Sequence, residues 1–465
     1  MTSAAADQRR EGAGRKVRTR RNVELAMLVF ATLIGLAAYA NVEIVMHGKL
    51  PPQIGWYAIG LVLVATITHV FVRIFARYAD PLLLPCVFLL NGIGLVFIHR
   101  LDISDSSGGN PLMQFIYTLV GIALFVAVLV LVRDHRLLRR FTYTAGVAGL
   151  VLLALPAVLP ASISAVHGAK LWIRIAGFSI QPGEFAKLLL MVFFAGYLVA
   201  KRDVLSLAGR RVLFVDLPRA KDLGPVLVAW VASLGILVFE HDLGSSLLFF
   251  GIFVAMLYIA TGRVSWIIIG LVLFGGGSFL AYHLFAHVRE RFNIWLHPFK
   301  DPDNSYQLIQ GLFGMADGGI TGTGLGQGRP TLVPFAKSDF IIAGLGEELG
   351  LAGLMAILLV YLVVVARGMR IALASRDGFG KLLAAGLSVA VALQVFVVVG
   401  GVTRLIPLTG LTTPFLSYGG SSLLANWALI ALLLRVSDAA RRPTPDPSST
   451  HRVEPEDSPT EVVQP

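Results

Sequence analysis

The sequence predicts an all-α polytopic membrane protein of about twelve transmembrane helices, with one long extracytoplasmic loop over 286–339. Two observations lead to this prediction. The 465 residues are 56% hydrophobic and only 14% charged, whereas a soluble domain carries about 25% charged residues. Apolar runs close to the roughly 20 residues that a spanning helix needs also recur along the chain. These runs lack the alternation of membrane β-strands, so they predict helices.

Twelve apolar segments are expected to cross the membrane. In chain order they are 24–44, 55–76, 80–98, 112–132, 142–161, 183–200, 223–240, 243–261, 265–285, 340–366, 380–403 and 414–435. The single cysteine, Cys86, lies inside the third segment. A disulfide framework is therefore excluded, and a buried apolar thiol is the interpretation that composition favours.

Lysine and arginine give the orientation, because cytoplasmic loops are enriched in them. A cytoplasmic N-terminus puts most of the basic residues on one side of the membrane. They cluster at 9–21, 133–140, 201–221, 367–381 and 441–442. Both termini are then cytoplasmic. The net charge of +11 follows this topology and predicts no binding of nucleic acid.

The segment 286–339 is much the longest of the expected outer loops. Such a length is typical of a functional or a disordered segment, and its aromatic residues, glycine turns and paired charges favour an ordered, functional one. Arg289 and Arg291 open the loop, and Asp339 closes it. The glycine run 318–328 follows no strand, so we interpret it as turns and packing and not as a nucleotide cradle.

Ionisable residues at or inside a bilayer are costly and thus candidate functional residues. Glu184 and Lys187 are three residues apart and share one helical face. They form either a structural ion pair between helices or part of a site lining. Asp242 precedes Leu-Gly between two apolar runs. It either caps the following helix or, with Glu240 and His241, binds a cation. These alternatives stay open.

Asp339 stands at the start of a long apolar segment on the outer side. It is either a helix cap or a carboxylate at the mouth of a cavity, tunable towards general-base chemistry. Arg404 lies in a short outer loop and is a candidate anion clamp. Ser417 lies in a small-residue stretch, 417–422, whose simplest role is close helix packing.

The expected outer face carries one well-placed carboxylate and several cations. A carboxylate can deprotonate an acceptor hydroxyl, and cations can face a diphosphate, so this set suits a glycosyltransferase that uses a lipid diphosphate donor. Such a donor needs no second carboxylic acid, because its leaving group departs as an anion. No HExxH motif, cysteine cluster or Ser-His-Asp arrangement offers another hydrolytic or metal chemistry. A transporter could carry the same residues.

Several motifs in a fixed order give the sequence a resemblance to a known family. They are Gly168–Trp172, Gln181–Lys187, Asp242–Ser246, Tyr306-Gln307, Gly322–Gly328, Ser338–Ile341, Gly346–Gly350 and Pro414–Ser422. The chain resembles the shape, elongation, division and sporulation (SEDS) family, whose branches are RodA, FtsW and SpoVE. The basic, proline-rich termini are most similar to those of the actinobacterial RodA branch. The resemblance implies a multi-pass protein of the bacterial cytoplasmic membrane that polymerises lipid II into glycan strands on its outer face during cell-wall elongation.

The resemblance also assigns residues. Asp339 matches the family's catalytic carboxylate and would activate the acceptor 4-hydroxyl. Asp242 would bind a divalent cation, Mg²⁺ or Mn²⁺. The expected substrate-binding residues are Lys170, Trp172, Glu184, Lys187, Arg289, Arg291, Arg404 and Ser417. The expected partners are undecaprenyl-diphosphate-linked lipid II, membrane lipids and a transpeptidase of the class B penicillin-binding proteins.

The family core has ten helices, which divides the chain into four regions. They are a basic cytoplasmic tail at 1–22, two additional helices at 23–78, the glycosyltransferase core at 79–436 and a disordered cytoplasmic tail at 437–465. Phe335 and Lys337 stand where the family has Glu and His, Thr409 where it often has Lys, and Lys170 lies one position before a missing Arg. A lipid II transporter, a division-specific paralogue and a non-catalytic scaffold are the alternative functions.

Overall fold

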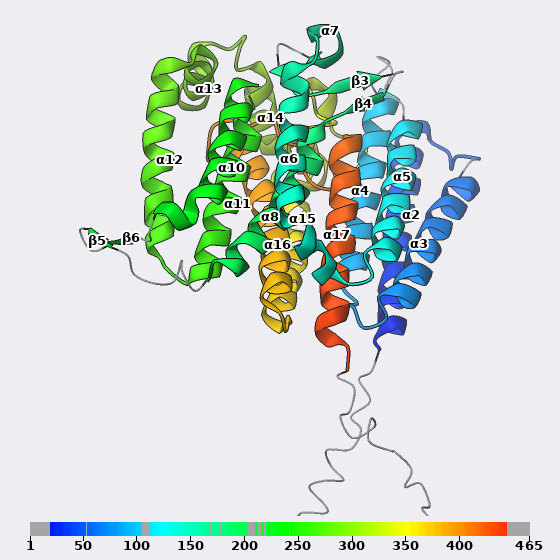
Figure 1. Cartoon of the computed structure of the whole chain (residues 1–465). Coiled ribbons are helices and arrows are strands. Elements are labelled where there is room, and N and C mark those ends of the chain that lie inside the picture. Colours follow the sequence, from blue (N-terminus) through cyan, green and yellow to red (C-terminus); the bar gives the residue numbers. More distant parts are fainter. Residues whose placement is uncertain are drawn as a thin grey trace, which may run out of the picture.

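The computed structural model describes residues 19–52, 54–104, 111–166, 169–175, 178–202, 210–212, 215–217, 220–240 and 242–443. Its long helices lie side by side in one bundle (Figure 1). They are α2 (Arg21–His47), α3 (Ile54–Phe75), α4 (Leu83–Ser104), α5 (Pro111–Leu131), α6 (Thr142–Val158), α8 (Pro182–Ala200), α10 (Ala220–Phe239), α11 (Leu243–Thr261), α12 (Ser265–Leu284), α15 (Ile341–Ala374), α16 (Gly378–Val402) and α17 (Gly420–Arg441).

Each of the twelve predicted segments corresponds to one of these helices, which confirms the all-α membrane fold. Within the described residues, eleven helices are long and apolar enough to cross a membrane, and α10 contributes the shorter apolar stretch Leu227–Ile236. α17 continues to Arg441, past the expected core boundary at 436. The expected tails lie outside the described residues, apart from the few that join α2 and α17.

Short elements cover one end of the bundle, which we call the loop face; α2 begins and α17 ends at the opposite, terminal face (Figure 1). The short elements are α7 (Ala161–Ser164), α13 (Ala286–Leu296), η2 (Pro298–Lys300), α14 (Tyr306–Gly318), η3 (Pro330–Leu332) and the strands β1 (Ala165–Val166), β2 (Ala169–Lys170), β3 (Ile173–Ile175) and β4 (Phe178–Ile180). β1 pairs with β2 and β3 with β4, both antiparallel. The expected long loop is therefore ordered around α13 and α14.

Two further short segments complete the elements. The 3₁₀ helix η1 (His135–Phe141) precedes α6, and the antiparallel hairpin of β5 (Arg210–Val212) and β6 (Val215–Leu217) precedes α10. The core of the bundle is apolar: α6 packs on α8, α15 on α16 and α17 on α5. The Trp427 ring meets Phe125 and Phe415 edge to face, the favourable geometry for aromatic pairs.

α15 is interrupted, although the sequence predicted an unbroken helix. Gly350 has φ 68° and ψ −174°, a conformation that glycine adopts without a steric penalty. The main chain on either side bonds to the segment after α14: Leu351 N donates to Gly319 O at 2.9 Å, and Thr323 N donates to Glu347 O at 2.9 Å. The first part of α15, which follows Asp339, is therefore a separate short helix buried against α14.

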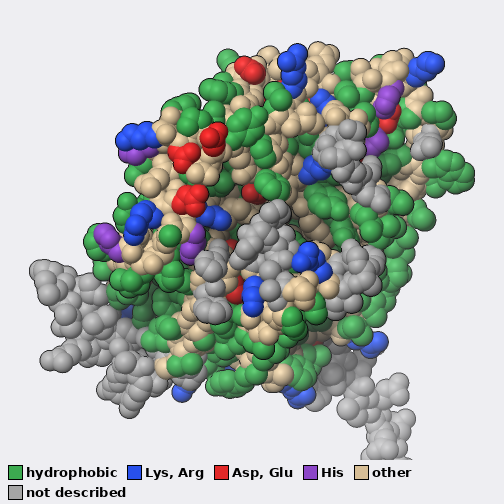
Figure 2. Space-filling model, turned by 90° about the horizontal axis from the view of Figure 1, so that it is seen from above, with side chains coloured by type: hydrophobic (Ala, Val, Ile, Leu, Met, Phe, Trp, Pro, Cys, Tyr) green, Lys and Arg blue, Asp and Glu red, His purple; other side chains and the backbone are tan. Residues whose placement is uncertain are grey.

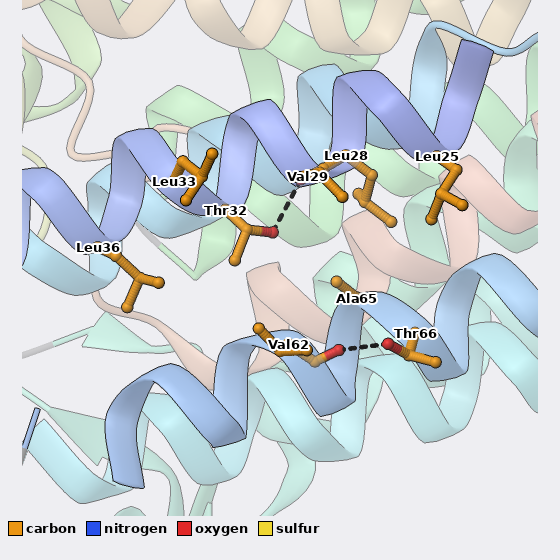
Figure 3. A pocket seen from close by; sticks show the side chains of 9 residues that line it. All are labelled: Leu25, Leu28, Val29, Thr32, Leu33, Leu36, Val62, Ala65 and Thr66. Atoms are coloured by element: carbon orange, nitrogen blue, oxygen red, sulfur yellow. Dashed lines mark hydrogen bonds between the residues drawn. The ribbon is translucent and has the colours of Figure 1, made fainter. Parts of the chain in front are cut away.

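The additional helices α2 and α3 enclose a shallow apolar groove of about 120 Å³ (Figure 3). Its polar lining groups, the hydroxyls of Thr32 and Thr66, are satisfied within their own helices by Leu28 O and Val62 O. The groove contains none of the candidate site residues. At its loop-face end, α2 packs instead on α4 and on the glycine run, where Val42 joins an apolar cluster with Leu325.

Candidate functional site

Asp339 lies in a tight turn between η3 and α15. Phe335 opens the turn with φ 57°, a backbone conformation that is strained for a bulky side chain. Ser338 N donates to Phe335 O at 2.9 Å. Phe340 closes the turn with a fully buried ring, and a side chain at Gly311 would collide with that ring. The turn is thus fixed at both of its ends.

The structure excludes the helix-cap interpretation of Asp339. The residue that caps α15 is Phe340, and no side chain caps that helix end. The Asp339 carboxylate instead accepts a hydrogen bond from Ser338 Oγ at 3.1 Å. Burial raises the pKa of Asp339, while Ser338, Arg291 and Gln307 act against that rise. A carboxylate with a raised pKa is a better base than a solvated one, as general-base catalysis requires.

The short segment before α17 supports the Asp339 turn. Ser417 is buried, and its Oγ donates to Ser338 O. Tyr418 N donates to Lys337 O at 2.7 Å. On the other side, Gln307 Nε2 donates to Pro334 O at 3.1 Å. Ser417 therefore acts on the main chain of the turn, and its expected contact with substrate stays a prediction.

Glu184 and Lys187 form a buried ion pair at the start of α8. Lys187 Nζ lies 2.9 Å from Glu184 Oε2 and donates to Gln394 Oε1 of α16 at 2.9 Å. The same amide, through its Nε2, donates to Thr412 O at 2.9 Å. The pair thus joins α8 to α16 and to the segment before α17. This geometry supports the structural interpretation, and it leaves a second, substrate-facing role open.

Asp242 caps α11. Its Oδ1 accepts from Ser245 N at 2.8 Å, as the helix-cap interpretation expected. Burial raises the pKa of Asp242, Arg291 lowers it and Glu184 raises it. The neighbouring Glu240 is buried and its Oε1 has no partner; burial, followed by Asp242, raises the pKa of Glu240 to about 8. His241, the third member of the expected cluster, lies outside the described residues.

Arg291 of α13 connects the two candidate carboxylates electrostatically. Its positive charge acts on both Asp339 and Asp242, and its Nη1 donates to Leu408 O at 2.8 Å. Asp242 is in turn affected by Glu184. The structure therefore brings together Asp339, Arg291, Asp242 and the Glu184–Lys187 pair, which the sequence distributes over 156 positions.

The other two expected arginines bond to the ends of helices. Arg289 Nε and Nη2 donate to Tyr282 O and His283 O, in the last turn of α12. Arg404 Nε and Nη2 donate to Trp295 O and Leu296 O, at the end of α13. Cations at a helix C-terminus satisfy free carbonyl groups and the helix dipole. Arg289 also lines an open polar groove of about 540 Å³ along α13 and η2, and Asp339 does not line that groove.

Lys170 and Trp172 lie half-buried in the hairpin region between α7 and α8. β2 and β3 contact α7, and β4 contacts α17. Within the part of the chain that the structure describes, Lys170 forms no ion pair. Their expected role in substrate binding stays a prediction. Figure 2 shows the loop face, where charged and histidine side chains gather, with hydrophobic side chains on the flanks.

Two acidic residues that the sequence left without a role hold the glycine run. Arg100 Nε lies 2.9 Å from Glu348 Oε1, and Arg100 Nη2 donates to Gly328 O at 2.8 Å. Glu348 Oε2 accepts from Gly326 N at 2.9 Å, and Glu347 accepts from Arg329 N. The glycine run is therefore a scaffold between η3 and α15. Glu347 and Glu348 lie about 20 residues after the glycine run, so no local sequence pattern predicts these contacts.

The residues around Asp242 fit a divalent cation only if the substrate supplies some of the ligands of that cation. No three His, Cys, Asp or Glu side chains are arranged to hold a metal among the residues that the structure describes. Mg²⁺ in phosphoryl sites is commonly held by one or two carboxylates together with substrate phosphates. Asp242, on which the charge of Glu184 acts, fits an ion that arrives with a diphosphate.

Comparison with known proteins decides the family. The model of the cell cycle protein family of FtsW, RodA and SpoVE matches residues 80–442. The chain belongs to this family. RodA of Mycobacterium tuberculosis H37Rv, named a peptidoglycan glycosyltransferase, is 55% identical over 431 residues, with 91% of this chain and 92% of the relative covered. RodA of Mycobacterium leprae is 53% identical over 435 residues, with the same coverage.

A further relative and two solved structures match at lower identity. The probable peptidoglycan glycosyltransferase FtsW of Geobacter metallireducens is 36% identical over 327 residues, with 70% of this chain and 84% of the relative covered. A solved peptidoglycan synthase complex, described as coordinating polymerization and crosslinking, contains a chain that is 27% identical, with a TM-score of 0.58 and coverage of 77% and 97%. The crystal structure of RodA from Thermus thermophilus shares the fold at 24% identity, with a TM-score of 0.54 and coverage of 78% and 98%.

α2 and α3 lie outside the region that defines the FtsW/RodA/SpoVE family. The family match begins at Asp80, and about three quarters of this chain covers nearly all of each solved neighbour. The alignment with the Mycobacterium tuberculosis relative is longer than 80–442, and it therefore extends beyond the family region.

Proposed function

We propose that this protein is a peptidoglycan glycosyltransferase of the RodA type, which polymerises lipid II during cell-wall elongation. The single observation that carries the proposal is Asp339, a half-buried carboxylate that caps no helix and is fixed by a strained turn. Sequence identity above 50% to the mycobacterial RodA proteins, named peptidoglycan glycosyltransferases, supports the activity and the branch.

In the proposed reaction, the Asp339 carboxylate takes the proton from the acceptor 4-hydroxyl. The oxygen attacks the anomeric carbon of the donor sugar, and the bond to the undecaprenyl diphosphate breaks. The electron pair leaves with the diphosphate. Because the acceptor oxygen attacks the face opposite to the leaving group in a single displacement, the new glycosidic bond has inverted configuration. In this proposal Arg291 stabilises the anionic leaving group; its charge acts on both Asp339 and Asp242, which supports that role.

A divalent cation, Mg²⁺ or Mn²⁺, would be held by Asp242 together with diphosphate oxygens, and when bound it would neutralise charge on the leaving group. The proposed orientation places the loop face outside the cytoplasm and both termini inside, because the basic clusters at 133–140, 367–381 and 441–442 lie at the terminal-face ends of α5, α15 and α17. A class B penicillin-binding protein is the proposed partner; the solved complex that coordinates polymerization and crosslinking supports this choice.

The test is polymerisation of labelled lipid II by the purified full-length protein together with its transpeptidase partner. We expect glycan strands from the wild type and none from Asp339→Asn, with both proteins equally expressed and equally able to bind the partner. Asp303→Asn, an exposed carboxylate on the same face, is the matched control and should polymerise normally. Glycan synthesis at the wild-type rate by Asp339→Asn would exclude the proposed base.

The break in α15 favours a second candidate function, transport of a lipid-linked precursor, because transporters use interrupted helices. The charged candidates, however, lie near the loop face and not halfway along the bundle. Proteoliposomes with fluorescent lipid II distinguish the two functions. A transporter moves lipid II between leaflets in the absence of any glycan product.

A further inference from the structure

The loop-face end of α4 reaches the Asp339 turn through a charged pair. Asp102 lies in the last turn of α4, and its side chain is only 5% exposed. Its Oδ1 lies 2.5 Å from Nζ of Lys337, and Lys337 is two residues before Asp339. The two partners are far apart in the sequence, and neither position contributes to the groups already assigned to the reaction.

Burial makes the loss of one partner of this pair more costly than it is in an ion pair on the surface. Exposed pairs are screened by water and salt and are worth little. A carboxylate removed from water is instead strongly dependent on its cation, because loss of the partner leaves an uncompensated charge. The Lys337 side chain is 23% exposed, so its ammonium lies at the edge of the protein while Asp102 lies inside.

Lys337 is held from two directions. Its side chain is held by Asp102 of α4, and its main-chain carbonyl accepts from Tyr418 N at 2.7 Å. Asp102 also lies close enough to Tyr418 to raise the pKa of that phenol, after burial and Tyr117. A displacement of Lys337 therefore moves the main chain that leads directly to Asp339.

We infer that Asp102 is a positioning residue for Asp339 and acts through Lys337. In this assignment the ammonium group of Lys337 anchors the turn to α4 and is not a ligand of the substrate diphosphate. The inference rests on the proposed function, in which Asp339 is the base. A misplacement of reacting groups by about 1 Å costs roughly 100-fold in rate, so a small shift of this turn is sufficient to matter.

The kinetic test compares Asp102→Asn, Lys337→Met and the exchanged pair Asp102→Lys with Lys337→Asp. We expect each single variant to lower kcat by about 100-fold at unchanged KM, and the exchanged pair to restore most of kcat. Asp303→Asn is the control for loss of a carboxylate on this face. Full kcat in both single variants overturns the inference. A raised KM in Lys337→Met, with Asp102→Asn unaffected, also overturns it and assigns Lys337 to the substrate.

Amide hydrogen exchange tests the same inference without catalysis. The amides of Ser338 and Tyr418, which bond across the turn, should exchange faster in Asp102→Asn and at the wild-type rate in Asp339→Asn and Asp102→Glu. Unchanged exchange in Asp102→Asn overturns the inference. If the wild type forms no glycan, the proposed function fails, and the exchange measurement still decides whether Asp102 holds the turn.

Discussion

The hydroxyl of Ser417 donates a hydrogen bond to the main-chain carbonyl of Ser338, 79 residues earlier in the chain. The Oγ of Ser417 also accepts a hydrogen bond from Thr413 N at 2.8 Å. One buried side chain therefore connects the segment before α17 to the turn that carries Asp339. The position of the candidate base depends on a residue that touches no part of its carboxylate.

Removal of this hydroxyl should weaken both segments. Ser417→Ala leaves Ser338 O and Thr413 N without a bond, and a buried unsatisfied polar group costs about 1–3 kcal/mol. We expect a lower unfolding temperature and a lower kcat for lipid II polymerisation. Thermal unfolding in detergent measures the first effect. Ser162→Ala, an exposed serine on the loop face, should match the wild type; equal stability of both variants would refute the link.

Replacement of Arg291 should change the dependence of the rate on pH. Burial raises the pKa of Asp339, and the charge of Arg291 opposes that rise. A base acts only when deprotonated, so the rate falls as the pH drops through its pKa. Arg291→Gln should therefore move the acidic limb of kcat/KM to higher pH, whereas Arg291→Lys should leave it in place.

Arg289→Gln is the control for that profile. Arg289 lies on the same helix, bonds to the end of α12 and is not among the charges that act on Asp339. Its acidic limb should coincide with that of the wild type. Superimposable profiles for all the arginine variants would contradict the proposed coupling of Arg291 to Asp339.

A double substitution distinguishes the structural role of the Glu184–Lys187 pair from a functional role. Lys187→Met alone leaves Glu184 buried without its cation, which costs about 3–5 kcal/mol. Addition of Glu184→Gln removes that charge and should restore much of the unfolding temperature. We expect the double variant to be stable and inactive in polymerisation. A stable and fully active double variant would reduce the pair to a connection between α8 and α16.

The break in α15 should tolerate no side chain. A Cβ at Gly350 would lie 2.2 Å from Gly322 N, and its positive φ disfavours other residues. Gly350→Ala should lower the free energy of unfolding by at least about 1–3 kcal/mol, as overpacking does. Gly92→Ala, on α4 with no atom within 4 Å of the added Cβ, should keep wild-type stability. Thermal unfolding compares the two.

The helices could be predicted because their signal is local. Each apolar run became one helix, and eleven of these helices, within the described residues, are long and apolar enough to cross a membrane. The break at Gly350 gave no such signal, because apolar residues continue before Glu347 and after Gly350, and hydropathy does not locate an interruption inside the segment 340–366. Gly346–Gly350 looked like part of one continuous helix, and its main-chain bonds to 319–323 depend on tertiary packing.

The candidate site could be predicted in part. The place of Asp339 at the start of a long apolar segment indicated a functional carboxylate, and the spacing of Glu184 and Lys187 indicated a possible ion pair. Asp102 and the support by Ser417 could not be found, because side-chain bonds to a distant main chain leave no pattern in the sequence. Arg289 and Arg404 were expected to contact anions. In the structure they bond to the C-terminal ends of α12 and α13, whose positions hydropathy does not predict. Their contact with substrate stays a prediction.

The packing of α2 against the glycine run has a consequence for the exchange of parts between family members. A Cβ at Gly326 would lie 3.1 Å from Val45 of α2, and Glu43 of the same helix pairs with His99 of α4 at 2.7 Å. A core without α2 would leave these surfaces uncovered. The residues of the core that face α2 are therefore matched to it, so we expect exchange of either part alone between family members to fail.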